Sequence, residues 1–293
     1  MTKSEFRALT ARGPVLLDGA TGSNLMKAGM PRGVCAELWN LEHPQVILEL
    51  QRSYVEAGSR ILYAPTFTGS EPYLAQHGLE DRLEELNSRL VALSKEAADG
   101  RALVAGDMTT MGRPDVPYER MLEYYTRQAG ALKNAGVDLL VAETLMGCEE
   151  AMAALEACSL VCDLPVLCSF SVTADGMLYF GGSVYEAAAQ LAGFGVDAVG
   201  VNCSGGPDQL ETVVRCLAAQ LTVPVIAKPN AGMPVIDDAG NAVYSMGPEE
   251  FAGHLETLRN AGAVLLGGCC GTDPAYIRAV RRKLAGCEKG SPA

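Results

Sequence analysis

Three cysteines stand where an apolar run ends in a glycine-rich turn. Cys203 lies in the segment VNCSGG, and the adjacent pair Cys269 and Cys270 lies in GGCCGT. Each segment has the pattern of a buried parallel strand followed by a turn. If both strands belong to one barrel, the three sulfurs meet at its carboxyl-terminal rim. Three thiolates suit a soft tetrahedral metal, most simply one Zn²⁺ with its fourth position open, as in catalytic zinc sites. The pattern therefore predicts an enzyme that activates another thiol.

The spacing of these cysteines shows what must hold such a metal. Cys203 and Cys269 are 66 residues apart, which is too far for a zinc finger or ribbon, so only the tertiary fold could bring them together. Two alternatives need no metal: the adjacent cysteines could be packed thiols or could form a vicinal disulfide. The glycines around the pair and the third cysteine at another strand end favour the metal.

Other polar residues also stand at the ends of apolar runs, where burial is costly unless the group is paired or functional. They are Asp18, Thr66, Asp107, Glu143, Asn202 and Asn230. Asp18 and Glu143 facing one pocket could share a substrate ammonium or act as general acid and base. None of the chain's three histidines follows such a run, so ammonium binding is favoured, and a structural carboxylate bonded to loop amides is the alternative. Asp107 and Asn230 are weaker candidates, because Asp and Asn often only stabilise turns.

The elements that must position these residues recur along the chain as short apolar runs, each followed by an amphipathic helical pattern. The runs are residues 15–18, 61–64, 103–106, 139–143, 166–170, 199–203, 225–228 and 264–267. Eight such units predict a (β/α)₈ barrel with a parallel sheet covered by helices. An open doubly wound sheet is the alternative, but the first run is not followed by Gly-x-Gly-x-x-Gly.

Two connections are long for a barrel. Residues 20–43 follow the first strand and residues 231–247 follow the seventh, so both are expected over the carboxyl-terminal face. Residues 235–244 have the pattern of a small hairpin. These connections could be tolerated insertions, but their place over the mouth favours lids.

Composition limits the class of protein. The chain has 293 residues and a net charge of −12, which argues against a nucleic-acid or anionic membrane partner. It shows neither an apolar signal core at its start nor a membrane-spanning apolar run. We therefore expect a cytoplasmic protein with reduced thiols, forming a single barrel domain over residues 1–293 with a frayed tail at 289–293.

The strand-end motifs resemble those of the homocysteine S-methyltransferase family. The matching segments are DGATG at 18–22, TF at 66–67, ET at 143–144, GVNC at 200–203, PNAG at 229–232 and GGCCGT at 267–272. The similarity is greatest to the homocysteine-binding module of cobalamin-dependent methionine synthase. It implies a zinc-bearing (β/α)₈ barrel that methylates L-homocysteine to methionine.

The resemblance also implies roles for individual residues. The zinc ligands would be Cys203, Cys269 and Cys270. Asp18 and Glu143 would bind the substrate ammonium, amides near Gly19, Ala20 and Phe67 would meet its carboxylate, and Thr66 belongs to the same substrate-binding set. Betaine as donor is disfavoured, because residues 66–70 read TFTGS and Leu145 follows the ET motif, at places where the betaine branch has tyrosines.

The methyl donor is the open question. The chain lacks Gly-x-Gly-x-x-Gly for a Rossmann-type S-adenosylmethionine site, Asp-x-His-x-x-Gly for a cobalamin module, and a second domain for a folate. We therefore expect a methylcorrinoid, such as methylcobalamin, carried by a separate protein. The alternatives are S-methylmethionine as donor, a different thiol or selenol as acceptor, and a thiol-binding subunit of a larger methyltransferase.

Overall fold

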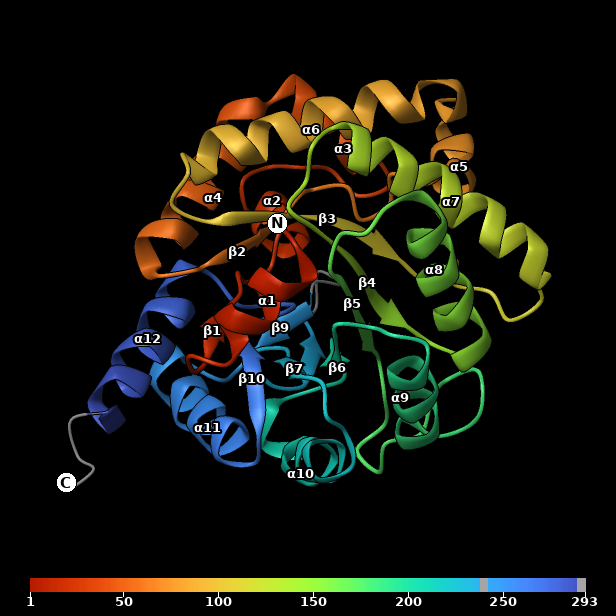
Figure 1. Cartoon of the computed structure of the whole chain (residues 1–293). Coiled ribbons are helices and arrows are strands. Elements are labelled where there is room, and N and C mark those ends of the chain that lie inside the picture. Colours follow the sequence, from red (N-terminus) through yellow and green to blue (C-terminus); the bar gives the residue numbers. More distant parts are fainter. Residues whose placement is uncertain (238–241, 289–293) are drawn as a thin grey trace.

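The fold is described from a computed structural model, which covers residues 1–237 and 242–288, without the side chains of 286–288 (Figure 1). The predicted frayed tail at 289–293 lies outside the described residues, as does the tip of the predicted hairpin. In the described part of the chain, no helix combines the length and apolar composition that crossing a membrane requires.

Eight parallel strands form one sheet in the order β1-β10-β7-β6-β5-β4-β3-β2. Their bounds are Val15–Leu16 (β1), Ile61–Tyr63 (β2), Leu103–Thr109 (β3), Leu139–Leu145 (β4), Val166–Phe170 (β5), Ala198–Asn202 (β6), Val225–Lys228 (β7) and Ala263–Leu266 (β10). A parallel bridge between Leu17 and Ile61 joins the two edge strands and closes the barrel. All eight predicted strands are present, and β3 extends three residues beyond its predicted end.

Eight helices alternate with these strands and surround the sheet (Figure 1). They are α4 (Pro44–Ala57), α6 (Leu83–Ala98), α7 (Tyr118–Asn134), α8 (Cys148–Val161), α9 (Val184–Gly193), α10 (Glu211–Gln220), α11 (Pro248–Asn260) and α12 (Pro274–Glu288). The predicted (β/α)₈ barrel is thereby confirmed. Short helices add to it: α1 (Lys3–Thr10), α2 (Gly22–Lys27), α3 (Ala36–Glu42) and α5 (Glu71–Leu74).

Four of the surrounding helices lead into the next strand through a glycine. Gly58, Gly136, Gly195 and Gly262 all have positive φ, between 82° and 117°. Only glycine adopts this left-handed backbone at little cost, and it ends the helix by satisfying its last carbonyl groups. The Ala-Gly or Phe-Gly before β2, β4, β6 and β10 is therefore a local signal that separates one unit from the next.

The hydrophobic core has two layers. Inward-facing strand residues fill the barrel, and Phe6 of α1 packs against them with none of its surface exposed. α1 lies over the centre of the barrel in Figure 1, at the end opposite the carboxyl termini of the strands. The second and larger layer lies between the sheet and the helices. α1 therefore covers this end of the barrel, and the other end, where the loops after the strands lie, is the place where barrel enzymes carry their sites.

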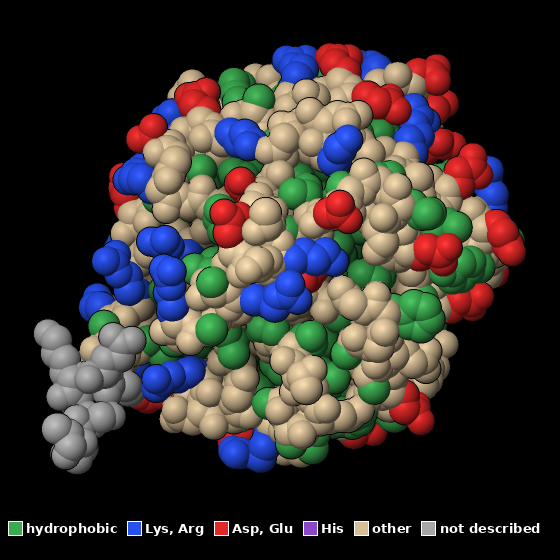
Figure 2. All heavy atoms as spheres, in the orientation of Figure 1, with side chains coloured by type: hydrophobic (Ala, Val, Ile, Leu, Met, Phe, Trp, Pro, Cys, Tyr) green, Lys and Arg blue, Asp and Glu red, His purple; other side chains and the backbone are tan. Residues whose placement is uncertain are grey.

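Charged side chains of both signs are interspersed on the face around α1 (Figure 2). Many are paired, as Arg282 of α12 is with Glu249 of α11. Over the whole sequence the chain is acidic, because Asp and Glu outnumber Lys and Arg by 35 to 23.

Candidate functional site

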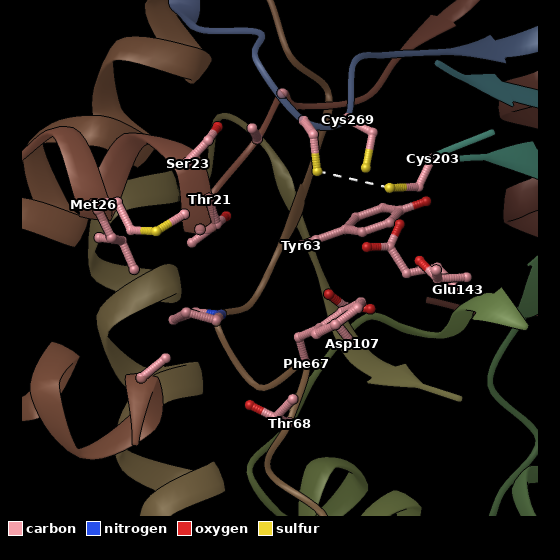
Figure 3. A pocket seen from close by; sticks show the side chains of 18 of the residues that line it. Thr21, Ser23, Met26, Tyr63, Phe67, Thr68, Asp107, Glu143, Cys203 and Cys269 are labelled. Atoms are coloured by element: carbon pink, nitrogen blue, oxygen red, sulfur yellow. Dashed lines mark hydrogen bonds between the residues drawn. The ribbon is translucent and has the colours of Figure 1, made fainter. Parts of the chain in front are cut away.

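The three cysteine sulfurs meet at the carboxyl-terminal rim of the barrel (Figure 3). Cys203 follows β6 directly, and Cys269 and Cys270 lie just after β10. Their Sγ atoms all lie within 4.8 Å of one another, and the Sγ atoms of Cys203 and Cys270 are 3.7 Å apart. All three thiols are free in this structure, with no disulfide between Cys269 and Cys270. Among the described residues this is the one group of Cys, His, Asp and Glu side chains close enough to hold a metal ion.

Backbone hydrogen bonds to the end of β7 fix the turns that carry the sulfurs. The Cys203 N–H donates to the carbonyl oxygen of Lys228 at 3.3 Å, and the Cys269 N–H donates to that of Pro229 at 2.7 Å. Cys203 has φ +48°, in the left-handed region that non-glycine residues seldom adopt. Thr272 Oγ1 donates to the Cys269 carbonyl oxygen at 2.8 Å. The sulfurs are thus positioned before any ligand binds.

The donor set fits a zinc ion. With Zn–S distances of about 2.3 Å, tetrahedral geometry places two sulfurs about 3.8 Å apart. The 3.7 Å separation between Cys203 and Cys270 agrees with that value. Of the three thiols only Cys270 favours the deprotonated state that metal binding needs. Hydrogen bonds to Cys269 and Cys270 raise the pKa of Cys203. A contact with Cys203 lowers the pKa of Cys269, but Cys270 and burial together outweigh it and hold that pKa at about 11. Contacts with Cys203 and then Cys269 lower the pKa of Cys270 to about 3, because both neighbours stabilise its thiolate.

A buried lysine lies between the two carboxylates predicted to bind an ammonium group. Lys228 ends β7, and its Nζ lies 3.4 Å from Asp18 Oδ1 and 3.9 Å from Glu143 Oε2. The same atom lies 4.6 Å from the centre of the Tyr63 ring. Burial alone would lower the pKa of Lys228, but Glu143 and Asp18 outweigh it and hold the pKa well above its usual range. The lysine is therefore a permanent positive charge inside this acidic group.

The sequence analysis missed Lys228. The signal was present, because the lysine ends an apolar run just as Asp18 and Glu143 do. The structure brings those two carboxylates to the same place, as expected, but separates them with a resident cation.

Asn202 ties Glu143 and Thr144 to β6. Its Nδ2 donates to Glu143 Oε2 at 3.3 Å and to Thr144 Oγ1 at 2.8 Å. Its Oδ1 accepts from the Thr144 N–H and from Ser169 Oγ, both at 2.8 Å. These bonds hold Thr144 at φ +61°, which is costly for a β-branched residue. Burial raises the pKa of the Glu143 carboxyl to about 7. Asn202 therefore orients the carboxylate rather than facing a ligand itself.

Two further polar groups lack a partner. Asp107 and Tyr63 both line the cavity described below, and Asp107 Oδ1 and the Tyr63 hydroxyl are buried without a hydrogen bond in the described structure. Burial, and then the nearby Glu143 charge, raises the pKa of Asp107 well above its usual range. Thr66 lies behind this residue, because its Oγ1 accepts from the Asp107 N–H at 3.1 Å and donates to the Asp107 carbonyl oxygen at 2.8 Å. Thr66 thus positions Asp107.

One cavity of about 780 Å³ is lined by the three cysteines and by Tyr63, Asp107, Glu143 and Lys228, whereas Asp18, Thr66 and Asn202 are absent from its described lining. Its other walls come from the loop after β2 and from the two long connections. The first connection contributes residues of α2 and α3, among them Met26 and Asn40. The second contributes Ala242 and Tyr244 of β9 (Ala242–Tyr244), which pairs with β8 (Pro234–Ile236) as the predicted hairpin. Both connections therefore wall the mouth, which agrees with their predicted place.

The remaining predicted residues differ in how they meet the cavity. Gly19, Ala20 and Phe67 line it. The Ala20 N–H donates to Thr272 Oγ1 at 3.1 Å, so this amide already has a partner. Asn230 is absent from the described lining; its N–H donates to the Gly205 carbonyl oxygen at 3.0 Å, and its buried Oδ1 has no partner in the described structure.

Comparisons with known proteins agree with the geometry. The sequence pattern of the homocysteine S-methyltransferase family matches residues 15–284. Methionine synthase of Mycobacterium leprae is 30% identical over 94% of this chain, and that of Mycobacterium tuberculosis is 29% identical over 93%. The chain spans only about a quarter of the length of these relatives, at 24% and 25%.

A solved structure resembles the whole chain. The homocysteine methyltransferase MmuM from Escherichia coli, in its metallated form, has a TM-score of 0.82 and 26% sequence identity. The match covers 95% of this chain and 99% of that one.

Proposed function

The chain belongs to the homocysteine S-methyltransferase family, and we propose that it transfers a methyl group to the thiol of L-homocysteine on a zinc ion, giving methionine. One observation carries this proposal: three free thiols stand beside a group of buried carboxylates in a single cavity. The thiols suit a metal that binds sulfur, and the carboxylates suit the ammonium group of an amino acid. Together they match an acceptor that carries both a thiol and an ammonium group.

Cys203, Cys269 and Cys270 would hold the zinc ion. A bound zinc ion would keep the acceptor sulfur as a thiolate at neutral pH, although a free thiol has a pKa near 8.5. The side chains and amides of the cavity would bind the amino-acid end of the acceptor. Glu143, oriented by Asn202, lines the cavity together with Asp107, and Asp18 lies behind them against Lys228; these carboxylates would favour the acceptor's ammonium group.

Amides near Gly19 and Phe67 stand on the cavity wall where they could meet the acceptor carboxylate. With the amino-acid end held, the sulfur attacks the methyl carbon of the donor. The new S–C bond forms as the bond to the donor breaks, and its electron pair leaves with the donor. Met26 and Tyr244 would contribute apolar surface to the cavity wall around this step.

For the donor, we propose a methylcorrinoid on a separate protein. The relatives named methionine synthase are about four times as long as the region matched here, so the barrel is one part of those proteins. The mouth of this barrel also exposes apolar surface: Val235 and Ile236 of the hairpin are both 65% exposed, beside the cavity residue Tyr244. Exposed apolar groups of this kind commonly mark a protein contact. The proposal thus places the corrinoid protein on the hairpin side of the mouth.

S-methylmethionine is the second candidate donor. The observation that favours it is the match to MmuM, a homocysteine methyltransferase whose chain is covered over 99% of its length. A barrel of this size would need no docking partner if the donor diffused freely into the cavity.

Product analysis tests both candidates. Zinc-loaded protein is incubated with homocysteine and, in turn, with a methylcobalamin-loaded corrinoid protein, free methylcobalamin and S-methylmethionine, and methionine is quantified. Methionine formed with the corrinoid protein supports the proposal, and methionine formed only with S-methylmethionine supports the second candidate. Homocysteine binding without turnover of any donor would instead identify a thiol-binding subunit. Failure to bind homocysteine would refute the acceptor assignment.

A further inference from the structure

The cavity extends beyond the cysteines to a wall formed by α3 and the loop after β2. Glu37 and Asn40 of α3 and Thr68 of that loop line this part, and we call these three residues the α3 wall. In Figure 3, Thr68 lies on the side of Phe67 away from the cysteines. A volume of about 780 Å³ suits a drug-sized ligand, so homocysteine held at the cysteines would leave the α3 wall free for a second molecule.

Glu37 is a buried carboxylate whose hydrogen-bond partners are all uncharged. Its Oε1 accepts from the Thr68 N–H at 2.9 Å and from Thr68 Oγ1 at 2.7 Å. Its Oε2 accepts only from Cys35 Sγ, at 3.6 Å, and a thiol is a weak donor. Burial raises the pKa of Glu37, because these partners do not make up for the lost water. A ligand that donates an N–H to Oε2 would therefore stabilise the carboxylate.

Asn40 adds a second acceptor to this wall. It follows Glu37 by three residues on α3, so the two side chains share one face of the helix. Asn40 is only 1% exposed, and its Oδ1 is buried without a partner in the described structure. Gln51 Oε1 also lacks a partner, but Gln51 lies outside the described lining of the cavity. A buried acceptor without a donor is costly, and at Asn40 a molecule in the cavity could supply the donor.

We propose that Glu37 and Asn40 bind the methyl donor through N–H groups that the donor carries. This inference rests on the proposed function and assigns residues to its donor. Two acceptors on one wall call for a ligand with N–H donors, and both candidate donors have them: a corrin ring bears carboxamide side chains, and S-methylmethionine bears an ammonium group. The acceptor would then occupy the cysteine end of the cavity and the donor the α3 wall, so that the two molecules meet within one cavity.

Two pairs of donors test this on the wild-type protein. S-methylmethionine is compared with 4-(dimethylsulfonio)butanoate, which lacks only the amino group, and methylcobalamin with a methylcorrinoid whose side-chain amides are replaced by methyl esters. Calorimetry on zinc-loaded protein without homocysteine measures affinity in the absence of methyl transfer, and KM with homocysteine present gives a second comparison. In one of the pairs, we expect the member with N–H groups to bind roughly 10-fold tighter, and that pair identifies the source of the methyl group.

Asn40→Leu tests the residue assignment. It should weaken the preferred donor and raise its KM, each roughly 10-fold, and leave the member without N–H groups, the zinc content and the affinity for homocysteine unchanged. Glu37→Gln should act in the same direction. Gln51→Leu is the matched control, because it removes a buried amide outside the described lining and should keep the donor preference. The unfolding transition shows whether each variant is folded; if neither α3 variant folds, the two donor pairs on wild-type protein still decide.

Three results would overturn the inference. Wild-type protein could show no preference within either pair, so that N–H groups play no part in donor binding. Asn40→Leu could leave the donor affinity unchanged or weaken both members of a pair equally, as a purely structural role would. It could also weaken homocysteine instead, which would place the acceptor at the α3 wall. If wild-type protein neither binds homocysteine nor forms methionine from any donor, the proposed function itself is wrong, and that outcome is distinct from a lost donor preference.

Discussion

Replacing Asn202 by alanine should damage both stability and the active site. The Asn202 side chain is fully buried and makes four hydrogen bonds, to Glu143, to Ser169 and twice to Thr144. A neutral hydrogen bond contributes about 1 kcal/mol net, and a buried group left unpaired costs about 1–3 kcal/mol. Because the Thr144 N–H and the Glu143 carboxylate both lose their partner, we expect the free energy of unfolding to fall by about 4 kcal/mol.

Urea unfolding of zinc-loaded protein measures this change, and calorimetry with homocysteine measures its effect on the site. Loss of the side chain also releases Thr144 from its left-handed backbone and lets Glu143 turn, so homocysteine affinity should fall as well. Asn87→Ala is the matched control. Asn87 is equally buried and donates to the carbonyl oxygens of Gly69 and Leu83, but it lies on α6, outside the described lining of the cavity.

The control variant should lose stability and keep its affinity for homocysteine. A loss below about 1 kcal/mol in Asn202→Ala would refute the reasoning, because it would mean that the four hydrogen bonds add no more than one typical bond. Equal affinities for homocysteine in the two variants would show that Asn202 stabilises the barrel without orienting Glu143.

Further changes give equally definite expectations. Gly200→Ala should abolish folding, because an added Cβ would lie 2.0 Å from a backbone oxygen of β7, whereas Gly22→Ala meets open space and should leave expression unchanged. Cys270→Ala should reduce bound zinc from one equivalent to none by elemental analysis and abolish methyl transfer, and the buried control Cys168→Ala should retain both; full activity of metal-free Cys270→Ala would contradict the zinc role. Burial raises the pKa of Glu143 from 4.5 to about 7, so the folded protein keeps a proton that the unfolded chain releases, and stability falls as the pH rises through this range. Glu143→Gln should therefore raise Tm relative to wild type more at pH 8 than at pH 5, and an equal difference at both values would contradict this sign.

Much of the fold could be predicted because its signals are local. Each strand is a short apolar run, and each glycine that ends a helix precedes the next run, as Gly136 does before β4. The periodicity of such units is set by residues close in sequence. Strand ends were less certain, since β3 continues to Thr109 and β4 to Leu145, beyond the apolar runs at 103–106 and 139–143 that predicted these strands.

The candidate site could be predicted only as a set of residues. Cys203, Cys269 and Cys270 were recognisable because several thiols at glycine-rich strand ends are typical of a metal site, and the barrel brings their sulfurs within 4.8 Å. Asp18 and Glu143 were recognisable as charges ending apolar runs. The partners of these carboxylates could not be predicted, because hydrogen bonds and ion pairs between strands depend on side-chain direction, which sequence spacing does not report.

By itself the sequence determined the number of barrel units, the residues at their carboxyl ends and the chemistry that those residue types allow. The tertiary structure decided which of these groups touch. It placed Lys228 against Asp18, left Asp107 Oδ1 without a hydrogen bond from the described residues, and made Asn202 a support for Glu143. The physical reason is that a buried charge takes its role from the groups within a few ångströms of it, and in a closed barrel those groups come from strands far apart in the chain.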